Sequence, residues 1–432
     1  MRRAETSRHA GAVARGTPAR RPNDLQLPLA IGFLQNPDQV NAQLTSPLFS
    51  KLPGELRESV WSFALTPYED LDNLYALDQR YARPGQTAPL RVAVGLLLTC
   101  RAIYIEAFLV PFQNIPIAIF DGDREDVPPP NPLQCTSTNW TQLRKLKPWQ
   151  FAQISSVELT VQQVMLEGGA IERASRLVGG KSRHAGYEAR NFTIAGYASF
   201  AEPKDLTSAQ NLGDNENKAL PMDNILVGKK ITHLTIRMSR TDWWTWSTDP
   251  RYEQQDPSKR LRLEPMINTT LATFSAMGAG YQARRAGQDP DFELDDFEKQ
   301  GRWGMHFAEF FPDLQTLELV LETFAPKQDQ LESVVECAKL WTFPLKDGHH
   351  LRWNGKPEST IRWEGASRYH YGEYTAWIWN CSRREASRDE NVQLWRQARE
   401  SSDQPRRGQV FVMKTLVFER QRNSDYEPPS EV

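Results

Sequence analysis

One pattern recurs through the last two thirds of the chain and constrains its fold more than any other feature. An apolar residue is followed by two spacer residues and then by apolar residues at alternate positions. Alternate apolar residues are typical of a β-strand with one buried face. We therefore expect four neighbouring strands of one sheet. The predicted strands cover residues 154–161, 231–238, 314–321 and, with the loosest match, 413–418.

Long segments with helical apolar spacing separate these strands. A strand, a helical excursion and a second strand is the order that a parallel sheet requires. The starts of the pattern lie 77, 83 and 99 residues apart, far more than the roughly 20–29 residues of a regular leucine-rich repeat. The sequence thus predicts an α/β fold with an irregular leucine-rich-repeat-like sheet and helical crossovers over residues 133–422. The predicted helices cover residues 263–284, 294–311, 328–341 and 384–400.

A second feature, near the N-terminus, is a pair of segments with helical periodicity. In Leu52–Leu65, Pro53 suits the first turn of a helix. The apolar residues that follow recur on one helical face, and they are Leu56, Val60, Phe63 and Ala64. In Leu96–Leu109 two neighbouring stripes are apolar or aromatic. We therefore predict helices over 46–65 and 90–109 that bury Leu56 and Leu98 in one core.

These two segments resemble the LPxELRxxIWxxAL and LLxTCRxIYxEA signature of a large fungal family of F-box-like domains of unknown function. The resemblance covers residues 48–120. It implies a helical module in a non-catalytic protein-interaction protein. In F-box proteins such a module docks on a Skp1-type adaptor of a ubiquitin ligase, and a repeat domain holds the substrate protein. One alternative is a stand-alone scaffold without any ligase, and the weakest alternative is an enzyme with an unrecognised site.

Specific residues of the motif carry these expectations. Leu52, Pro53 and Trp61 are expected to form the adaptor-binding surface of the module. An ion pair between Glu55 and Arg101 is expected to fix how the two helices cross. The residues assigned a structural role in the motif are Glu55, Leu56, Arg57, Val60, Cys100, Arg101, Tyr104 and Glu106.

Tryptophan is abundant, with 13 residues in the chain. Trp243, Trp244 and Trp246 directly follow the second predicted strand, and Arg237 lies within that strand. Core packing is the leading interpretation, because tryptophan buries a large area. A partner-binding surface is the alternative, since tryptophan and arginine are frequent at interface hot spots.

The chain is expected to divide at changes of composition. Residues 1–44 and 423–432 are predicted to be disordered tails, the first of them basic, and 66–89 an extended connection. The helical module, with a short strand at 115–120, is expected over 46–126. A proline-rich linker at 127–132 is expected to separate it from the sheet domain. Polar stretches at 165–220 and 247–258 are predicted to be irregular.

Composition and motifs limit the kinds of site and partner that we expect. The net charge is -2, which argues against a dedicated nucleic-acid surface. The four cysteines form no CxxC, so neither a disulfide framework nor a zinc site is predicted. No catalytic, metal-binding or cofactor motif occurs, and we expect no catalytic residue, no metal and no cofactor. The longest apolar run is too short for a bilayer, and we expect an intracellular protein, cytoplasmic or nuclear, with no membrane partner.

Overall fold

The computed structural model describes most of the predicted core of the chain. The described residues are 28–75, 82–121, 134–136, 146–179, 229–246, 259–266, 274–288, 302–367 and 406–422. Several of the predicted segments lie outside these residues. They are the linker at 127–132, the helix at 384–400, the stretch 247–258, the C-terminal tail and residues 1–27 of the N-terminal tail.

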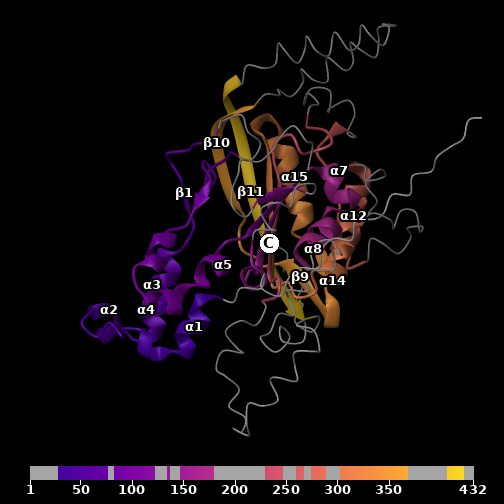
Figure 1. Ribbon diagram of the computed structural model, residues 1–432. Coiled ribbons are helices and arrows are strands. Elements are labelled where there is room, and N and C mark those ends of the chain that lie inside the picture. The colour runs from indigo at the N-terminus through magenta and orange to yellow at the C-terminus, as the bar shows by residue number, and fades with distance from the viewer. Residues whose placement is uncertain are drawn as a thin grey trace, which may run out of the picture.

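The centre of the molecule is a nine-stranded mixed sheet (Figure 1). Its strand order is β4-β3-β5-β6-β7-β11-β9-β8, and β10 pairs with β11 beside this path. The strands are β3 (Ile117–Asp121), β4 (Gln134–Thr136), β5 (Ser156–Val161), β6 (His233–Met238), β7 (Thr316–Phe324), β8 (Thr342–Pro344), β9 (His349–Trp353), β10 (Ser359–Ser367) and β11 (Arg406–Arg422).

The four segments with the recurring pattern do lie side by side, as β5, β6, β7 and β11. β5, β6 and β7 are parallel, and Leu159, Ile236 and Leu319 stand opposite one another in register. This confirms the prediction that the segments form neighbouring strands. β11 pairs antiparallel with β7, so the expectation of a parallel sheet is wrong for the fourth segment.

The leading apolar residue of the pattern has a structural role. Ile154, Ile231 and Leu314 are all buried just before their strands. The backbone N–H of Thr232 donates to the carbonyl of Ser155 at 2.9 Å, and that of Gln315 donates to Thr232 at 2.8 Å. The parallel pairing therefore begins before the regular strands do, and each leading residue closes the end of the core.

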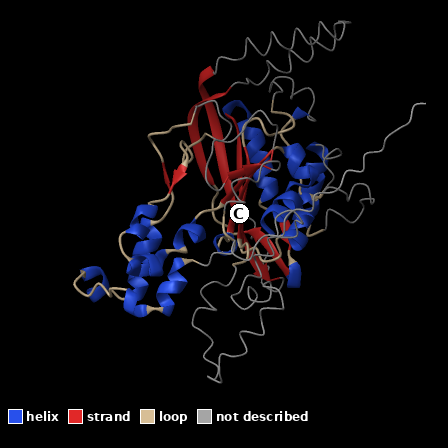
Figure 2. Cartoon of the chain, viewed as in Figure 1, coloured by secondary structure: helices blue, strands red, loops and turns tan. Residues whose placement is uncertain are grey.

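Helices cover one face of this sheet. α8 (Ile171–Gly179), α12 (Phe274–Arg285), α14 (His306–Phe310) and α15 (Gln328–Ala338) lie on the same side of it (Figures 1 and 2). The alternating apolar residues of the strands and the buried residues of these helices form one continuous core. The remaining elements around this core are α6 (Pro148–Ala152), α7 (Gln163–Met165), the π-helix η5 (Leu166–Ala170) and the 3-10 helices η8 (Trp303–Met305), η9 (Ala325–Lys327) and η10 (Lys346–Gly348).

The opposite face of the strands β5 to β7 carries hydrophilic side chains. We call it the polar face. Because successive strand residues point to opposite sides, this face holds Glu158, Thr235, Arg237 and Glu318, which alternate with the apolar core positions.

The N-terminal helices form a second unit (Figure 2). The helix predicted over 90–109 is confirmed only from Arg101 to Ala107 and is wrong as one continuous element, because this stretch breaks into several elements and turns sharply before Arg101. The elements of the unit are α1 (Leu29–Gln35), the 3-10 helix η2 (Pro37–Gln39), α2 (Pro47–Lys51), α3 (Gly54–Ala64), β1 (Tyr68–Glu69), β2 (Leu90–Arg91), the 3-10 helix η3 (Val94–Leu98), α4 (Arg101–Ala107) and α5 (Val110–Asn114).

Several predicted boundaries need correction. α1 lies within the predicted tail 1–44, yet its Ala30 and Ile31 are buried against Phe108 and Trp149. The strand predicted at 115–120 forms as β3, but it belongs to the central sheet and not to the helical module. Residues 171–179 are helical instead of irregular, because the apolar side of α8 packs into the main core.

The helices predicted for the sheet domain are confirmed only in part. The helix predicted at 328–341 is confirmed as α15. Of the described residues within 263–284, those from Phe274 onwards are helical as α12, and Leu263 lies in a buried irregular segment. In 294–311 the described part is η8 followed by α14.

Candidate functional site

The two motif helices meet at one carboxylate. Arg57 on α3 forms a two-point ion pair with Glu106 on α4, with its Nε 2.9 Å from Oε2 and its Nη2 2.8 Å from Oε1. The indole N–H of Trp61 donates to the same carboxylate at 3.0 Å. Burial raises the pKa of Glu106, but the hydrogen bonds from Arg57 and Trp61 and the charge of Arg57 outweigh it and lower the pKa below its ordinary value.

Three residues of the motif therefore form one structural contact. The expected pairing of Glu55 with Arg101 is wrong, and the ion pair that joins the two helices is the one between Arg57 and Glu106. Arg101 instead donates to the carbonyl of Gln39 and lies 5.0 Å from the ring centre of Phe33. Cys100 is half-buried beside the core of the module. The ring of Tyr104 packs against Phe33 and Phe108, and burial raises the pKa of its hydroxyl.

The orientation of α3 about its axis differs from the prediction. Trp61 and Leu65 face the core of the module with exposed fractions of 2% and 0%, and Arg57 lies on the same side. These positions are one residue further along than the predicted stripe, which turns the helix by about 100°. The helix takes this orientation because it buries the large indole of Trp61 and gives its N–H a partner.

The predicted buried stripe consequently faces solvent. Leu56 is 52% exposed, Val60 40% and Phe63 86%. Leu98, the expected partner of Leu56 in the core, is 85% exposed. The predicted burial of Leu56 and Leu98 is therefore wrong.

The orientation of α3 also changes which residues are available as the predicted adaptor-binding surface. Pro53 is exposed and Leu52 half-buried, but Trp61 is inside the module. The expectation that Trp61 anchors a partner is wrong, since its side chain is enclosed by the module and hydrogen-bonded to Glu106. The exposed apolar side chains of α3 are instead Leu56, Val60 and Phe63, which we call the α3 stripe.

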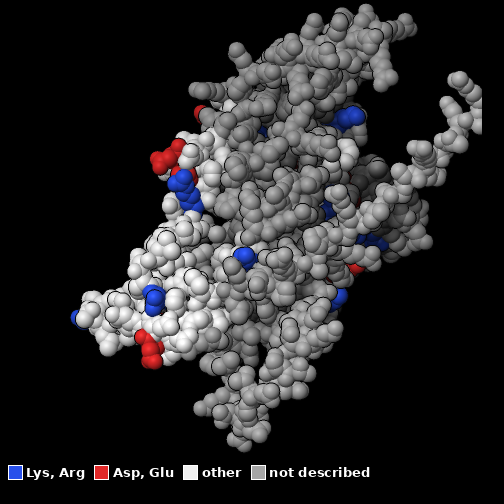
Figure 3. All heavy atoms as spheres, in the orientation of Figure 1, with Lys and Arg blue, Asp and Glu red and all other residues white. Residues whose placement is uncertain are grey.

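Exposed apolar side chains concentrate in the N-terminal unit. Of the fifteen large apolar residues that the structure describes as exposed, eleven precede residue 99. The view in Figure 3 shows a surface over these helices that few charged side chains interrupt. The exposed residues are Leu29, Leu34, Leu44, Leu56, Val60, Phe63, Tyr68, Leu71, Leu74, Val94 and Leu98. Such a concentration is typical of an interaction surface.

The predicted tryptophan surface is not brought together. Trp243 is buried, and its indole N–H donates to the carbonyl of Glu322 at 2.8 Å. Trp246 packs against the main core. Arg237 lies on the polar face, 2.6 Å from Glu158. Trp244 is the one exposed member of this group, at 48%, and donates to Glu167 at 2.6 Å. Core packing thus holds for Trp243 and Trp246.

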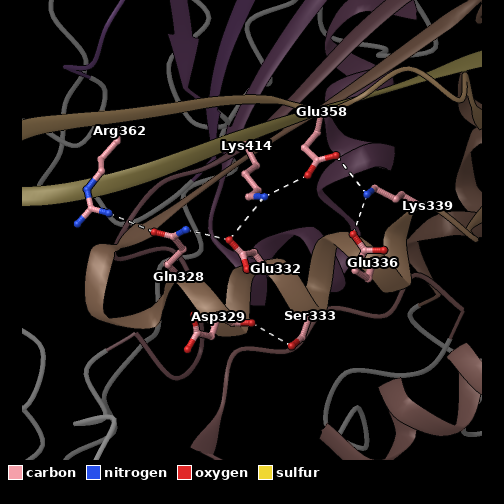
Figure 4. Close-up of polar contacts among 9 residues, drawn as sticks. All are labelled: Gln328, Asp329, Glu332, Ser333, Glu336, Lys339, Glu358, Arg362 and Lys414. Atoms are coloured by element: carbon pink, nitrogen blue, oxygen red, sulfur yellow. Dashed lines mark hydrogen bonds and ion pairs between the residues drawn. The ribbon is translucent and has the colours of Figure 1, made fainter.

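A charge network at the edge of the sheet has no signal in the sequence. Glu358, just before β10, lies 3.1 Å from Lys414 on β11 and 3.2 Å from Lys339 at the end of α15 (Figure 4). Lys414 also approaches Glu332 on α15 at 3.9 Å. Burial raises the pKa of Glu358, but its hydrogen bonds and the two lysines lower it to about 2. The network joins helix, strand and loop, and its members are too far apart in sequence for a motif to show.

The polar face has its own ion pairs. Glu158 is shared by Arg237 and by Arg83 from the connection 66–89, whose Nη2 lies 3.1 Å away. Glu318 lies 3.6 Å from His233 and accepts a hydrogen bond from Thr235 at 3.4 Å. The hydrogen bond from His233 is the main reason that the pKa of Glu318 lies below its ordinary value. Guanidinium and carboxylate groups in this arrangement can recognise charged side chains.

Neither metal clusters nor membrane helices emerge from the described residues. No group of three or more His, Cys, Asp or Glu side chains in this part of the chain is placed to hold a metal ion. None of the helices described combines the length and apolarity needed to cross a membrane. No protein-family model, curated protein or solved structure matches the chain.

Proposed function

We propose that this chain is a non-catalytic protein-interaction protein that docks on a partner through the α3 stripe. The observation that carries the proposal is the exposure of Leu56, Val60 and Phe63 on one side of a helix whose other side is firmly anchored. Aligned apolar side chains at this spacing suit a helix that lies in an apolar groove. The specific form we propose is an F-box-type substrate receptor of a ubiquitin ligase, with a Skp1-type adaptor as the partner and a further protein as the substrate.

The anchoring of α3 supports this function physically. Arg57 and Trp61 fix the helix to α4 through Glu106, and Arg57 also donates to the carbonyl of Leu52 at 2.7 Å. A helix that is held rigidly loses little conformational entropy when it binds, which favours affinity. The Glu106 contact therefore presents the stripe and takes no part in binding itself.

A purified Skp1-type adaptor tests the proposal directly. We expect the full-length chain to bind it in the micromolar range or tighter in isothermal titration calorimetry. The double substitution Leu56→Glu and Phe63→Glu should weaken binding at least tenfold, because it places charge in an apolar contact. Both side chains are exposed, so the melting temperature should hardly change.

The matched control is Val164→Glu, which changes a similarly exposed apolar residue of the sheet domain. It should leave adaptor binding unchanged. Absence of adaptor binding by the wild-type chain would contradict the ligase form of the proposal. Binding that survives the double substitution would contradict the assignment of the α3 stripe.

The second candidate function is a stand-alone binding protein without a ligase. It is favoured by the burial of Trp61, the residue expected to anchor an adaptor. In this case affinity purification of the tagged chain from its own cells should recover a partner without an adaptor or a cullin, and recovery of that partner should depend on Phe63.

A further inference from the structure

The connection between α3 and η3 is a closed loop that reaches from the helical unit to the sheet. Its base is fixed, because β1 and β2 pair antiparallel and Arg91 Nε lies 2.7 Å from Asp70 Oδ2. The N–H of Asp70 also donates to the carbonyl of Pro89 at 2.9 Å. The described tip, Ala82–Ala88, extends beyond this base. We call it the strap.

The strap lies on the polar face of the sheet. Arg83 is buried and pairs with Glu158 on β5 at 3.1 Å. Ala82 packs with Tyr75 against Phe120 on β3. The carbonyl of Ala82 accepts a hydrogen bond at 3.4 Å from Arg240, just beyond β6. The contacts therefore extend across three neighbouring strands, from β3 through β5 to the residues that follow β6.

The charges of the polar face explain why an arginine is placed there. Glu158 and Glu318 are two carboxylates of this face, and Arg237 is the guanidinium that the strands themselves set beside Glu158. Arg83 supplies a second guanidinium from outside the sheet. Removing it would leave Glu158 with Arg237 as its one remaining ion-pair partner among the described residues, so the face is complementary to a basic side chain.

Two effects act against the charged guanidinium of Arg83 in this position. Burial and repulsion from Arg237 lower the pKa of Arg83 to about 10, although Glu158 acts in the opposite direction. The guanidinium is therefore held at a desolvation cost and beside a like charge. An arginine from another chain would make the same ion pair with Glu158 at the same desolvation cost, so the exchange of one arginine for the other is close to neutral.

We propose that the polar face around Glu158 binds an extended basic segment of a partner protein that presents an arginine, and that the strap occupies this face as an intramolecular ligand. The occupied state hides Glu158. A partner segment displaces Arg83 and takes over its ion pair. This surface lies on the sheet and not on α3, so the proposal goes beyond docking by the α3 stripe and does not depend on it.

Hydrogen exchange tests whether Arg83 holds the strap. The probes are the N–H groups of Tyr75 and Gln86, which donate to Thr87 and Arg83 within the loop at 2.9 Å. Arg83→Met should speed their exchange at least tenfold and leave the amides of β5 and β6 protected. Arg176→Met, which removes an exposed arginine of α8, is the matched control and should change neither. Unchanged exchange in Arg83→Met would overturn the proposal.

A peptide of residues 82–90, labelled with fluorescein and added in trans, tests the binding surface itself. The full-length Arg83→Met variant should bind it at least tenfold more tightly than the wild-type chain does, and also at least tenfold more tightly than it binds the same peptide with alanine in place of arginine. The added substitution Glu158→Gln should remove both preferences. Equal binding of the two peptides, or no effect of Glu158→Gln, would overturn the proposal.

A folding defect in Arg83→Met would not prevent the test. Glu158→Gln alone keeps the shape of the side chain and removes its charge, and it should release the strap in the exchange experiment by the same mechanism. A strap that stays protected in this variant overturns the proposal. Loss of adaptor binding through the α3 stripe would leave all of these outcomes unaffected.

Discussion

At the scale of single residues, Glu106 determines how the helical unit is held together. One carboxylate satisfies the guanidinium of Arg57 and the buried N–H of Trp61. Replacing it by alanine leaves both donors without this acceptor. Glu106→Ala should therefore lower the free energy of unfolding by about 1–3 kcal/mol in denaturant titrations.

The control for this prediction is Glu55→Ala, which removes an exposed carboxylate of the same motif and should cost less than about 0.5 kcal/mol. The pH dependence has a defined sign. Because the pKa of Glu106 is lowered in the folded state, its contribution is complete above the ordinary carboxyl pKa and is lost on acidification. Equal effects of the two substitutions would contradict the assigned contact.

Glu358 makes a contribution to stability that depends on pH. Its folded pKa of about 2 lies below the ordinary value of 4.5. The unfolded chain therefore binds a proton first as the pH falls, and the stabilising contribution of Glu358 is lost between about pH 5 and pH 2. Glu358→Gln should be less stable than the wild-type chain at neutral pH, and the difference should narrow across this range in urea titrations.

Glu336→Gln is the matched control for Glu358, because Glu336 pairs with the same Lys339 but is well exposed. Exposed ion pairs contribute little, so this variant should follow the wild-type curve at every pH. A difference between Glu358→Gln and the wild-type chain that stays constant across this range would contradict the stabilising role assigned to the carboxylate charge of Glu358.

At the scale of elements, α3 and β5 to β7 show what the sequence can and cannot determine. Alternation and a leading apolar residue were enough to predict three parallel strands, because a one-residue slip would expose the whole apolar set. The stripe of α3 is ambiguous in the sequence, since its apolar residues, from Phe63 round to Trp61, spread over roughly 160° of the circumference. A partner for the Trp61 N–H, 45 residues away in the chain, decides the orientation.

Other features depended on long-range contacts in the same way. The direction of β11 could not be predicted from its loose pattern, because direction is set by the connection and not by alternation. Arg57 and Glu106 were identified as structural residues, but their pairing with each other was not. For the candidate site, the sequence points to α3, but which of its side chains are exposed is seen only in the structure.

A pair of leucines tests the placement of both elements. Leu319 lies in the centre of the sheet and is 1% exposed, whereas Leu56 is 52% exposed on α3. Leu319→Ala should lower the free energy of unfolding by about 2–5 kcal/mol, because it leaves a cavity in the core. Leu56→Ala should change it by less than about 0.5 kcal/mol. A large decrease in the free energy of unfolding of Leu56→Ala would instead support the predicted orientation of α3, in which Leu56 is buried.

At the scale of the whole molecule, the helical unit and the sheet are joined by an aromatic cluster and by the strap. Trp149 lies on α6, directly before β5, and its ring centre is 5.7 Å from Phe108 and 5.5 Å from Phe112. Ala30 and Ile31 of α1 close the same cluster. The two units are therefore one packed body at this end of the sheet, and the strap adds a second contact on the polar face.

The coupling of these two units depends on Trp149. Trp149→Ala should cost about 3–5 kcal/mol at the junction, and little inside either unit. We expect the wild-type chain to unfold in one calorimetric transition and the variant to show two, the helical unit melting first because its core is the smaller. Phe63→Ala removes an exposed aromatic side chain of the same unit and should keep the single transition. A single transition in Trp149→Ala, at a lower temperature, would instead mean that the remaining contacts of the junction and the strap are enough to couple the units.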